Sequence, residues 1–359
     1  MKPNLRQLPL LSPRADALEK CVYCPKLCRA ACPVSNAEPS ESLIPWGKMS
    51  AAYFMARGDV AITPESASVA WACTGCLACA ERCDHKNPVA ATLTDARADL
   101  YERGVAPPEA IALVARWPQL SDARKAAVSE LSHEQGHPVA HLLLGCSYAQ
   151  KEPRAARLAV RVAEALMGGK VALAKGCCGY PLDAAGDSAG ATREREALSR
   201  EVSSTDTLVV LDPGCFRALA PRLPNATLLL DRAAQVLDRF KPRPGLAPPR
   251  YHDPCQLGRG LGRYDAPREI LARVVGAPPL EFERSRERAD CAGAGGLVPV
   301  TRPQNSSAIA EERLSQHARL GGGPVATACG SSLHRLKKSG ADARDLVEYM
   351  AIGLGLDCE

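Results

Sequence analysis

Eight of the sixteen cysteines in this 359-residue chain lie in two short runs, and this grouping constrains the fold more than any other feature. The first run contains Cys21, Cys24, Cys28 and Cys32. The second contains Cys73, Cys76, Cys79 and Cys83, in the spacing C-x2-C-x2-C-x3-C. Such spacing lets a short loop wrap three thiolates around one iron–sulfur cluster, while the fourth cysteine points to another cluster. The first run follows the same pattern with one extra residue between Cys24 and Cys28.

The paired runs predict two [4Fe–4S] clusters that exchange their fourth ligands. We expect cluster I to be held by Cys21, Cys24, Cys28 and Cys83. We expect cluster II to be held by Cys73, Cys76, Cys79 and Cys32. Two structural zinc sites are the alternative for the same thiols, but the interlocked spacing and the Cys32-Pro33 pair favour iron–sulfur.

Charge and hydropathy exclude several functional classes. The formal net charge is +5, and basic residues are interleaved with acidic ones, so we expect no nucleic-acid partner. The apolar run in residues 1–11 is too short for a secretory signal, and no apolar stretch is long enough for a membrane span. We therefore expect a protein that is cytoplasmic, or peripheral on the inner face of the membrane, whose cysteines are metal ligands or redox groups instead of disulfides.

The pattern of the chain changes after the cysteine runs. Residues 1–125 show helical signals, such as Thr63 followed by Pro64, and no strand alternation. Short apolar strands then alternate with helices in residues 135–240, and the same order returns in residues 250–359 after a linker rich in proline. Cysteines 177 and 291 are 114 residues apart, and so are cysteines 215 and 329, which indicates a duplication.

The remaining cysteines follow predicted strands. The first repeat (135–240) has Cys146, Cys177, Cys178 and Cys215, and the second (250–359) has Cys255, Cys291 and Cys329. Because the carboxyl ends of parallel strands meet at one edge of a sheet, we expect each set to converge on a metal or cluster site. Buried free thiols are the alternative. Cys358 is assigned no role.

Four further motifs make a family resemblance specific. They are Cys-Cys-Gly at 177–179, Asp-Pro-Gly-Cys at 212–215, His-Asp-Pro-Cys at 252–255 and Cys-Ala-Gly-Ala-Gly-Gly at 291–296. With the paired runs, the chain resembles the iron–sulfur subunits of glycolate oxidase, lactate utilisation and anaerobic glycerol-3-phosphate dehydrogenase, and the catalytic subunits of heterodisulfide reductase. The resemblance implies an α+β protein, with a mostly helical dicluster ferredoxin-type domain followed by two duplicated α/β cysteine-rich domains.

The chain departs from that family's pattern of five cysteines per repeat. Ala218 and Ser332 stand where the closing cysteine of each repeat would be, and Ala292 replaces the second cysteine of the Cys-Cys-Gly motif. Asp84 replaces the proline usual after the second run. The first repeat keeps four thiols, enough for an iron–sulfur centre or zinc, whereas the second keeps three.

The resemblance implies an electron-transfer subunit of an oxidoreductase complex. Electrons would pass between a flavin dehydrogenase, acting on a 2-hydroxy acid or similar substrate, and a quinone or other acceptor. The sequence contains no flavin-binding motif, so we expect this oxidoreductase component not to be catalytic alone. The alternatives are a subunit like that of heterodisulfide reductase, which reduces a disulfide at a cysteine-rich domain, and a scaffold stabilised by zinc.

Overall fold

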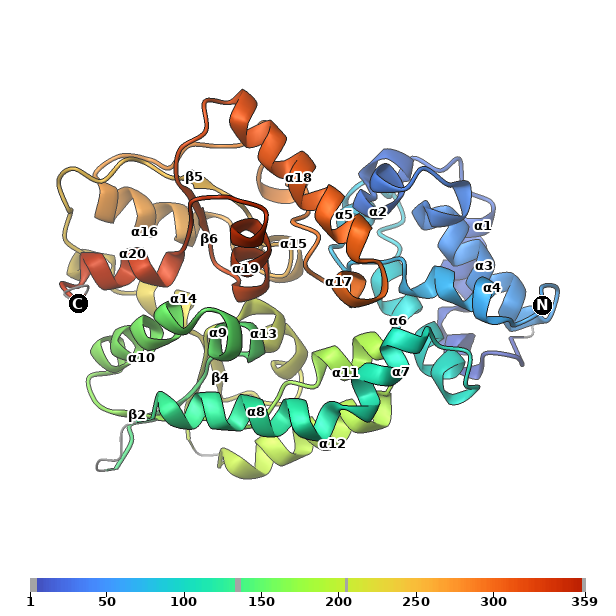
Figure 1. Cartoon of the computed structure of the whole chain (residues 1–359), viewed down its shortest axis with the longest axis horizontal. Helices are drawn as coiled ribbons and strands as arrows, with labels where there is room; N and C mark the ends of the chain where they lie inside the picture. Colours follow the sequence, from blue (N-terminus) through green and yellow to red (C-terminus); the bar gives the residue numbers. More distant parts are fainter. Residues whose placement is uncertain (1–4, 133–136, 204–205, 357–359) are drawn as a thin grey trace. The chain divides into compact units, whose positions relative to one another are not determined.

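The computed structural model describes residues 5–132, 137–203 and 206–356, so Cys358 lies outside the described residues (Figure 1). The chain forms two compact units. Unit 1 comprises Met1–Trp117, Pro181–Ala191 and Asp290–Arg313, and unit 2 comprises Pro118–Tyr180, Thr192–Ala289 and Leu314–Glu359. Two short segments of the predicted cysteine-rich repeats therefore belong to unit 1, and the three-domain division stays a prediction.

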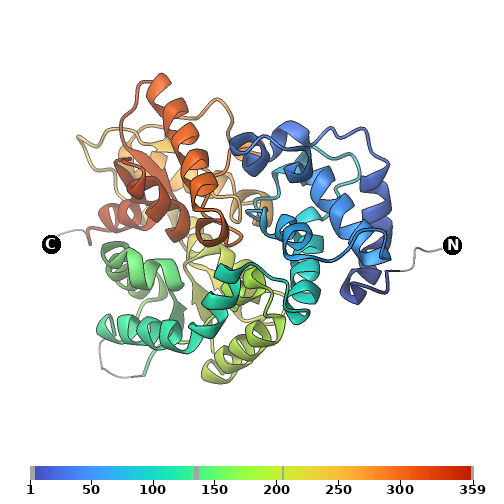
Figure 2. The same cartoon turned by 45° about the vertical axis from the view of Figure 1, so that its right-hand side comes forward.

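Unit 1 has a helical core that lies next to the second cysteine run. Helices α1 (Ala15–Val22) and α3 (Pro45–Arg57) pack side by side, as the blue segments of Figures 1 and 2 show. Trp71 is fully buried in the core that they share with α6 (Val89–Glu102). Because Trp71 precedes Cys73 by two residues, packing of the core fixes the start of the second run.

The sequence signal at Thr63 produces the expected helix start but a shorter helix. Thr63 Oγ1 accepts a hydrogen bond from the backbone N–H of Ser66, and Pro64 occupies the first turn of α4 (Pro64–Ser68). The sequence predicts a helix from this start to Cys73, but a 3-10 turn, Val69–Trp71, follows α4 instead. The remaining helices of unit 1 are α2 (Pro33–Ala37), α5 (Ala78–Glu81), α7 (Pro108–Ala115) and α17 (Val298–Thr301). The boundary between the units falls within α8 (Trp117–Glu130), α11 (Tyr180–Ala185), α12 (Ser188–Glu201) and α18 (Pro303–Arg319).

The first sheet of unit 2 contains four parallel strands in the order β2-β1-β3-β4. The strands are β1 (Ala140–Leu143), β2 (Val171–Leu173), β3 (Leu208–Val210) and β4 (Ala226–Leu228). Leu142 of β1 pairs with Leu173 on one side and Val209 on the other. These central strands are short, apolar and largely buried, as expected for a parallel sheet covered on both faces.

The second sheet of unit 2 repeats this topology. Its parallel strands are β5 (Arg250–Tyr251), β6 (Val325–Thr327) and β7 (Ala343–Asp345), in that order. Leu280 adds a parallel bridge to Arg250 on the free side of β5. The order Leu280-β5-β6-β7 thus corresponds to β2-β1-β3-β4, which is the relation expected of a duplicated α/β unit.

Helices cover both sheets of unit 2. Helix α10 (Pro153–Met167) begins with a proline in its first turn and ends at Gly168, whose φ of 74° allows the left-handed C-terminal residue. The others are α8 (Trp117–Glu130), α9 (Cys146–Lys151), α13 (Pro213–Leu219), α14 (Leu229–Ala234), α15 (Gly258–Leu261), α16 (Asp265–Val275), α19 (Gly330–Lys338) and α20 (Leu346–Gly353). A helical module and parallel sheets in one chain confirm the predicted α+β class.

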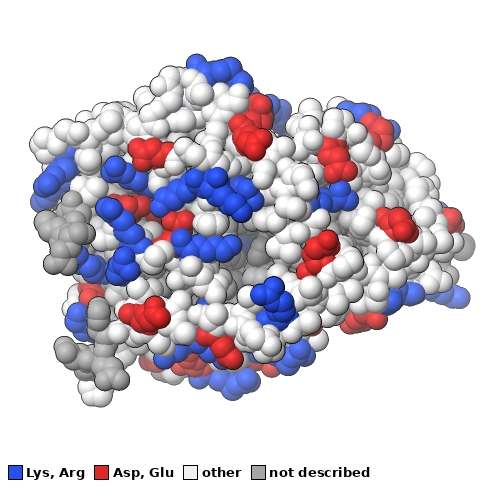
Figure 3. Space-filling view, in the orientation of Figure 1, with Lys and Arg blue, Asp and Glu red and all other residues white. Residues whose placement is uncertain are grey.

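The surface carries charges of both signs, as the sequence predicted. Lysine and arginine side chains occur among aspartate and glutamate side chains on the face seen in Figure 3. Within the part of the chain that the structure describes, none of the helices combines the length and the apolar character needed to cross a bilayer.

Candidate functional site

The first group of thiols brings Cys83 to three cysteines of the first run. Cys21 lies in the last turn of α1, and burial raises the pKa of its thiol to about 12. A hydrogen bond with the Asn87 side chain opposes this rise. The nearby thiols of Cys28, Cys83 and Cys24 add to it. This group has the composition predicted for cluster I, and its role as a ligand set stays a prediction.

The second group brings Cys32 to three cysteines of the second run. Burial raises the pKa of the Cys79 thiol well above its ordinary value. The thiols of Cys73, Cys76 and Cys32 raise it further, and that of Cys28 has a smaller effect. Each group therefore contains one cysteine from the other run, which is the arrangement that the ligand assignment for cluster II requires.

The backbone of the second run turns sharply to place its thiols. Gly75 has a φ of 68° and Leu77 a φ of 64°, so two left-handed residues lie between Cys73 and Cys79. The Gly75 N–H points to Cys73 Sγ at 3.4 Å. Hydrogen bonds from backbone N–H groups to cysteine sulfur are one way in which proteins adjust the reduction potential of an iron–sulfur cluster.

The donor set fits the chemistry of iron–sulfur clusters. None of the described cysteines forms a disulfide, so the thiols of both groups are available as ligands. Across residues 5–132, 137–203 and 206–356, no three His, Cys, Asp or Glu side chains are arranged to hold a metal ion. The assignment of the ligand residues therefore rests on the spacing of the cysteines and on which thiols are neighbours, and it stays a prediction.

Arg97 fastens the second run to other segments of unit 1. Its buried guanidinium donates hydrogen bonds to four backbone carbonyl groups, those of Ala70, Cys73, Ala184 and Gly296, at 2.9–3.1 Å. No sequence motif marks this residue. The available signal was its spacing, because Arg97 follows the buried Leu93 by four residues and so lies on the core face of α6.

The glycines of the Cys-Ala-Gly-Ala-Gly-Gly motif allow its backbone to contact the second run. A Cβ atom on Gly295 would lie 2.3 Å from the Thr74 carbonyl oxygen, and one on Gly296 would lie 2.0 Å from that of Cys73. Only glycine fits such an approach. In the same loop, the Gly293 N–H points to Cys291 Sγ at 3.3 Å. Within unit 1, the predicted cluster II loop and the segment after Cys291 thus share one backbone interface.

The four thiols of the first repeat form a continuous group in unit 2, in which Cys177, Cys178 and Cys215 are buried and Cys146 is partly exposed. Cys146 Sγ lies 3.9 Å from Cys177 Sγ. The Cys178 side chain is hydrogen bonded to those of Cys177 and Cys215. Interaction with Cys177, followed by burial, raises the pKa of the Cys146 thiol well above its ordinary value, and Arg124 opposes this rise.

The thiol group of the first repeat packs closely against Gly145 and encloses only a small cavity. A Cβ atom on Gly145 would lie 2.9 Å from Asp212 Cβ and 3.3 Å from Cys215 Sγ, so a larger residue would displace the group. The thiols surround a cavity of about 10 Å³, no larger than a water molecule requires. The four sulfur atoms predicted to act together therefore lie together, and what they bind stays a prediction.

Two of the three thiols predicted in the second repeat lie near each other in unit 2. Burial raises the pKa of the Cys329 thiol well above its ordinary value. The nearby charge of Asp212 raises it further, and that of Cys255 does so more weakly. Cys329 Sγ lies 3.8 Å from Asp212 Oδ2. Cys291, the third, belongs to unit 1. Asp212 was not singled out by sequence analysis as a contact between the repeats.

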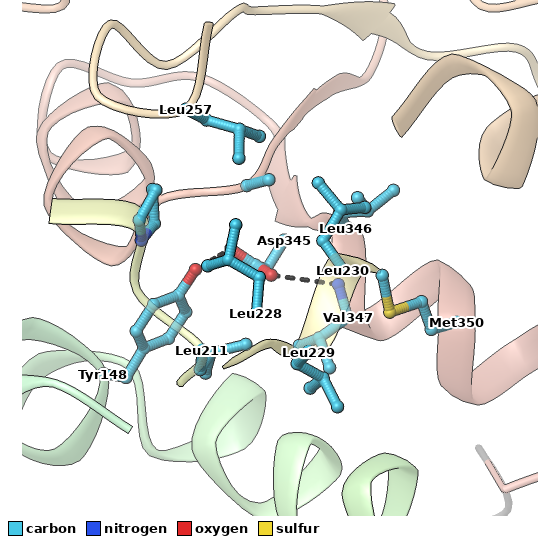
Figure 4. Close-up of a pocket in the computed structure, with 12 residues that line it drawn as sticks. Tyr148, Leu211, Leu228, Leu229, Leu230, Leu257, Asp345, Leu346, Val347 and Met350 are labelled. Atoms are coloured by element: carbon cyan, nitrogen blue, oxygen red, sulfur yellow. Dashed lines mark hydrogen bonds between the residues drawn. The ribbon is translucent and has the colours of Figure 1, made fainter. Parts of the chain in front are cut away.

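A buried polar pair lies beside an apolar cavity between the two sheets. Tyr148 Oη donates a hydrogen bond to Asp345 Oδ2 at 2.6 Å, and the Val347 N–H donates to Asp345 Oδ1 at 2.9 Å (Figure 4). The cavity measures about 20 Å³ and is lined mainly by apolar side chains, including those of Leu228 and Leu257. Its size and apolar lining indicate packing between the repeats and not a substrate pocket.

Comparison with known families assigns these segments. The family described as 4Fe-4S dicluster domain matches residues 17–87, and the family described as Cysteine-rich domain matches residues 140–220 and again 250–337. The chain contains a 4Fe–4S dicluster domain followed by two cysteine-rich domains. The dicluster match includes both cysteine runs, and the two cysteine-rich matches contain both sheets except β4 and β7.

Several curated proteins are similar to this dicluster and cysteine-rich chain. It is 35% identical over 112 residues to a subunit of the dihydromethanophenazine:CoB–CoM heterodisulfide reductase of Methanosarcina barkeri, across 30% of this chain and 27% of the relative. The protein of the same name from Methanosarcina acetivorans is 27% identical over 206 residues, 51% of this chain and 50% of the relative. A subunit of the fumarate reductase (CoM/CoB) of Methanothermobacter marburgensis is 28% identical over 159 residues, 43% of this chain and 32% of the relative.

The matched stretches span between about a quarter and a half of these relatives' lengths. The comparisons confirm the predicted resemblance to iron–sulfur proteins with cysteine-rich domains, among them subunits of reductases. These relatives are named as subunits of reductases.

Proposed function

We propose that this chain is the electron-transfer subunit of an oxidoreductase complex and carries two [4Fe–4S] clusters. The observation that carries the proposal is the exchange of thiols between the runs, with Cys83 beside Cys21 and Cys32 beside Cys79. Separate four-cysteine zinc sites would not require this exchange, whereas paired clusters built from one chain do.

The chain would supply the thiolate ligands of the clusters, exclude water from them and hold them in fixed positions. Cluster I would be held by Cys21, Cys24, Cys28 and Cys83, and cluster II by Cys73, Cys76, Cys79 and Cys32. When bound, the clusters would supply one-electron exchange. The partly buried thiols keep much of the water away from the sulfur atoms, and Arg97 holds the backbone of the second run in place. The fixed geometry favours transfer without large movement of the protein.

The proposed complex includes a flavin dehydrogenase partner. The partner would oxidise a 2-hydroxy acid or similar substrate, and a quinone or other acceptor would receive the electrons. This part of the proposal rests on the family resemblance and on the names of the relatives as reductase subunits. The thiols of the first repeat, Cys146, Cys177, Cys178 and Cys215, would hold a further iron–sulfur centre or zinc.

Anaerobic purification of the chain with its native partners tests the proposal. We expect about eight iron and about eight acid-labile sulfide per chain, the content of two [4Fe–4S] clusters, and an EPR signal on reduction. We also expect a flavoprotein dehydrogenase to co-purify and to reduce the clusters when its substrate is added. Stoichiometric zinc without sulfide, or clusters that no co-purified dehydrogenase reduces, would contradict the proposal.

The second candidate function is disulfide reduction at the first cysteine-rich domain. The contiguous thiols of Cys146, Cys177, Cys178 and Cys215 favour it, as does the similarity to heterodisulfide reductase. A reduced viologen dye as electron donor, with a mixed disulfide as acceptor, tests it. Turnover that Cys178→Ala abolishes while both [4Fe–4S] signals persist would establish this function instead of simple electron transfer.

A further inference from the structure

Lys48 places a buried positive charge against the second group of thiols. Its side chain is in α3, the residue is only 2% exposed, and its Nζ donates a hydrogen bond to Cys32 Sγ at 3.2 Å. The same ammonium is the strongest influence that favours the thiolate form of Cys73. Lys48 therefore lies near two of the four sulfur atoms proposed to hold cluster II.

The position of Lys48 is fixed by close backbone packing. A Cβ atom on Gly47 would lie 2.1 Å from the Glu41 carbonyl oxygen, so glycine lets the start of α3 approach the preceding 3-10 turn, Glu41–Leu43. Cys32 Sγ also lies 3.8 Å from the Leu43 carbonyl oxygen. The sulfur is thus held between that turn and the Lys48 ammonium.

A buried ammonium requires a compensating negative charge. Within residues 5–132, 137–203 and 206–356, no carboxylate forms an ion pair with Lys48, and a neutral thiol is a weak partner for a charge removed from water. Four thiolates around a [4Fe–4S] cluster leave a net negative charge, which grows when the cluster accepts an electron. Such a cluster would supply the missing partner.

The lysines beside the first run are placed differently. Lys20 is exposed and pairs with Asp16 at 2.7 Å, and Lys26 lies 4.0 Å from Glu41. Their charges are partly neutralised by carboxylates and screened by solvent. The charge of Lys48 is instead buried against the second group of thiols.

We propose that Lys48 is a positioning residue that raises the reduction potential of cluster II above that of cluster I, so that cluster II is reduced first. This inference rests on the proposed ligand sets. The physical reason is that a nearby positive charge stabilises the more negative, reduced form of a cluster, and does so most strongly where water is excluded. Electrons entering the dicluster domain would therefore reside at the cluster whose loop contacts the Cys-Ala-Gly-Ala-Gly-Gly segment.

Redox titration of the full chain, followed by EPR, tests the assignment. Lys48→Met removes the charge at similar volume, Lys48→Gln keeps an N–H donor without the charge, and Lys48→Arg keeps the charge. We expect the two neutral variants to lower the higher of the two midpoint potentials by about 59 mV, so that the ratio of reduced to oxidised cluster falls about tenfold at fixed potential. The other midpoint should stay unchanged. Lys48→Arg and the exposed control Lys20→Met should leave both midpoints near wild-type values.

Iron and sulfide analysis separates the possible failures. Two results would overturn the role of Lys48 but leave the proposed function intact. One is unshifted midpoints in Lys48→Met and Lys48→Gln proteins that contain their full iron and sulfide. The other is an equal shift in Lys48→Arg. If both neutral variants lose about half of their iron while Lys48→Arg keeps it, charge compensation at one cluster is supported; equal loss in Lys48→Arg overturns it. Wild-type protein without iron and sulfide would overturn the proposed function, and with it this inference.

Discussion

Tyr148 and Asp345 link the two cysteine-rich repeats through a hydrogen bond of 2.6 Å. Tyr148 is in α9, two residues after the first cysteine of the first repeat, and Asp345 ends β7 of the second sheet. Asp345 also caps α20, because its Oδ1 accepts the Val347 N–H and its own N–H donates to Glu348. One buried carboxylate therefore joins a sheet, a helix start and the neighbouring repeat.

We expect Asp345→Asn to reduce the pH dependence of folding. Burial raises the pKa of Asp345 to about 7, above the value of about 3.9 in an unfolded chain. The folded state therefore binds the proton more tightly, and this contribution to stability is complete below about pH 4 and is lost as the pH rises through about 7. Asparagine cannot ionise but can still accept the Val347 N–H. Between about pH 5 and about pH 8, wild type should therefore lose about 1 to 3 kcal/mol more unfolding free energy than the variant.

Urea unfolding at the two pH values measures this effect. The exposed carboxylate of Asp238 offers a matched control, because Asp238→Asn removes a charge without removing a buried group. An equal change of unfolding free energy with pH in wild type and Asp345→Asn would show that Asp345 does not titrate across this range.

The crossed ligand sets predict which single cysteine variants resemble each other. Cys32→Ala should perturb the same EPR signal as Cys73→Ala, although the two residues belong to different runs. Cys83→Ala should likewise resemble Cys21→Ala. The reason is that Cys32 lies near Cys79, and Cys83 near Cys21. Iron analysis and EPR of the reduced variants check the pairing, and a Cys32→Ala spectrum matching Cys21→Ala would mean that each run holds its own cluster.

Much of this arrangement follows from spacing along the chain. The Pro153 and Gly168 signals define the ends of α10 because both act through local backbone geometry, and short apolar runs identify β1, β2 and β3. Strand β7 was not predicted, because Ala343–Asp345 is short and carries Arg344, so it lacks the apolar pattern of a buried strand.

Contacts between distant segments could not be read in the same way. Arg97 and Lys48 look like ordinary polar residues of helices, and only the folded chain brings their charges to Cys73 and Cys32. The sequence also does not predict that Cys291 belongs to unit 1, because strand order predicts a sheet edge but not how the loops extend beyond it.

We expect Arg97→Met to destabilise unit 1 and to loosen the segment after Cys291. The substitution leaves four backbone carbonyl oxygens without their guanidinium donor, and buried unsatisfied groups of this kind cost several kcal/mol together, about 3 or more. Hydrogen exchange should accelerate in residues 290–297 and 70–76. Arg97→Lys, which keeps the charge but only a point donor, should restore little of the protection. Unchanged exchange in residues 290–297 of Arg97→Met would show that Arg97 does not hold this loop.

The two cysteine-rich domains should respond unequally to loss of one thiol. Cys178 contacts both Cys177 and Cys215 in a contiguous group of four thiols, whereas Cys291 belongs to a different unit from Cys255 and Cys329. Removing a member of a complete four-thiolate set weakens metal binding more than removing a thiol from an incomplete one. We therefore expect Cys178→Ala to lose more bound metal and more dye-coupled electron transfer than Cys291→Ala. Metal analysis and dye reduction on both variants, with the [4Fe–4S] EPR signals as an internal control, measure the difference. Equal losses would show that the two repeats bind metal alike despite Ala292 and Ser332.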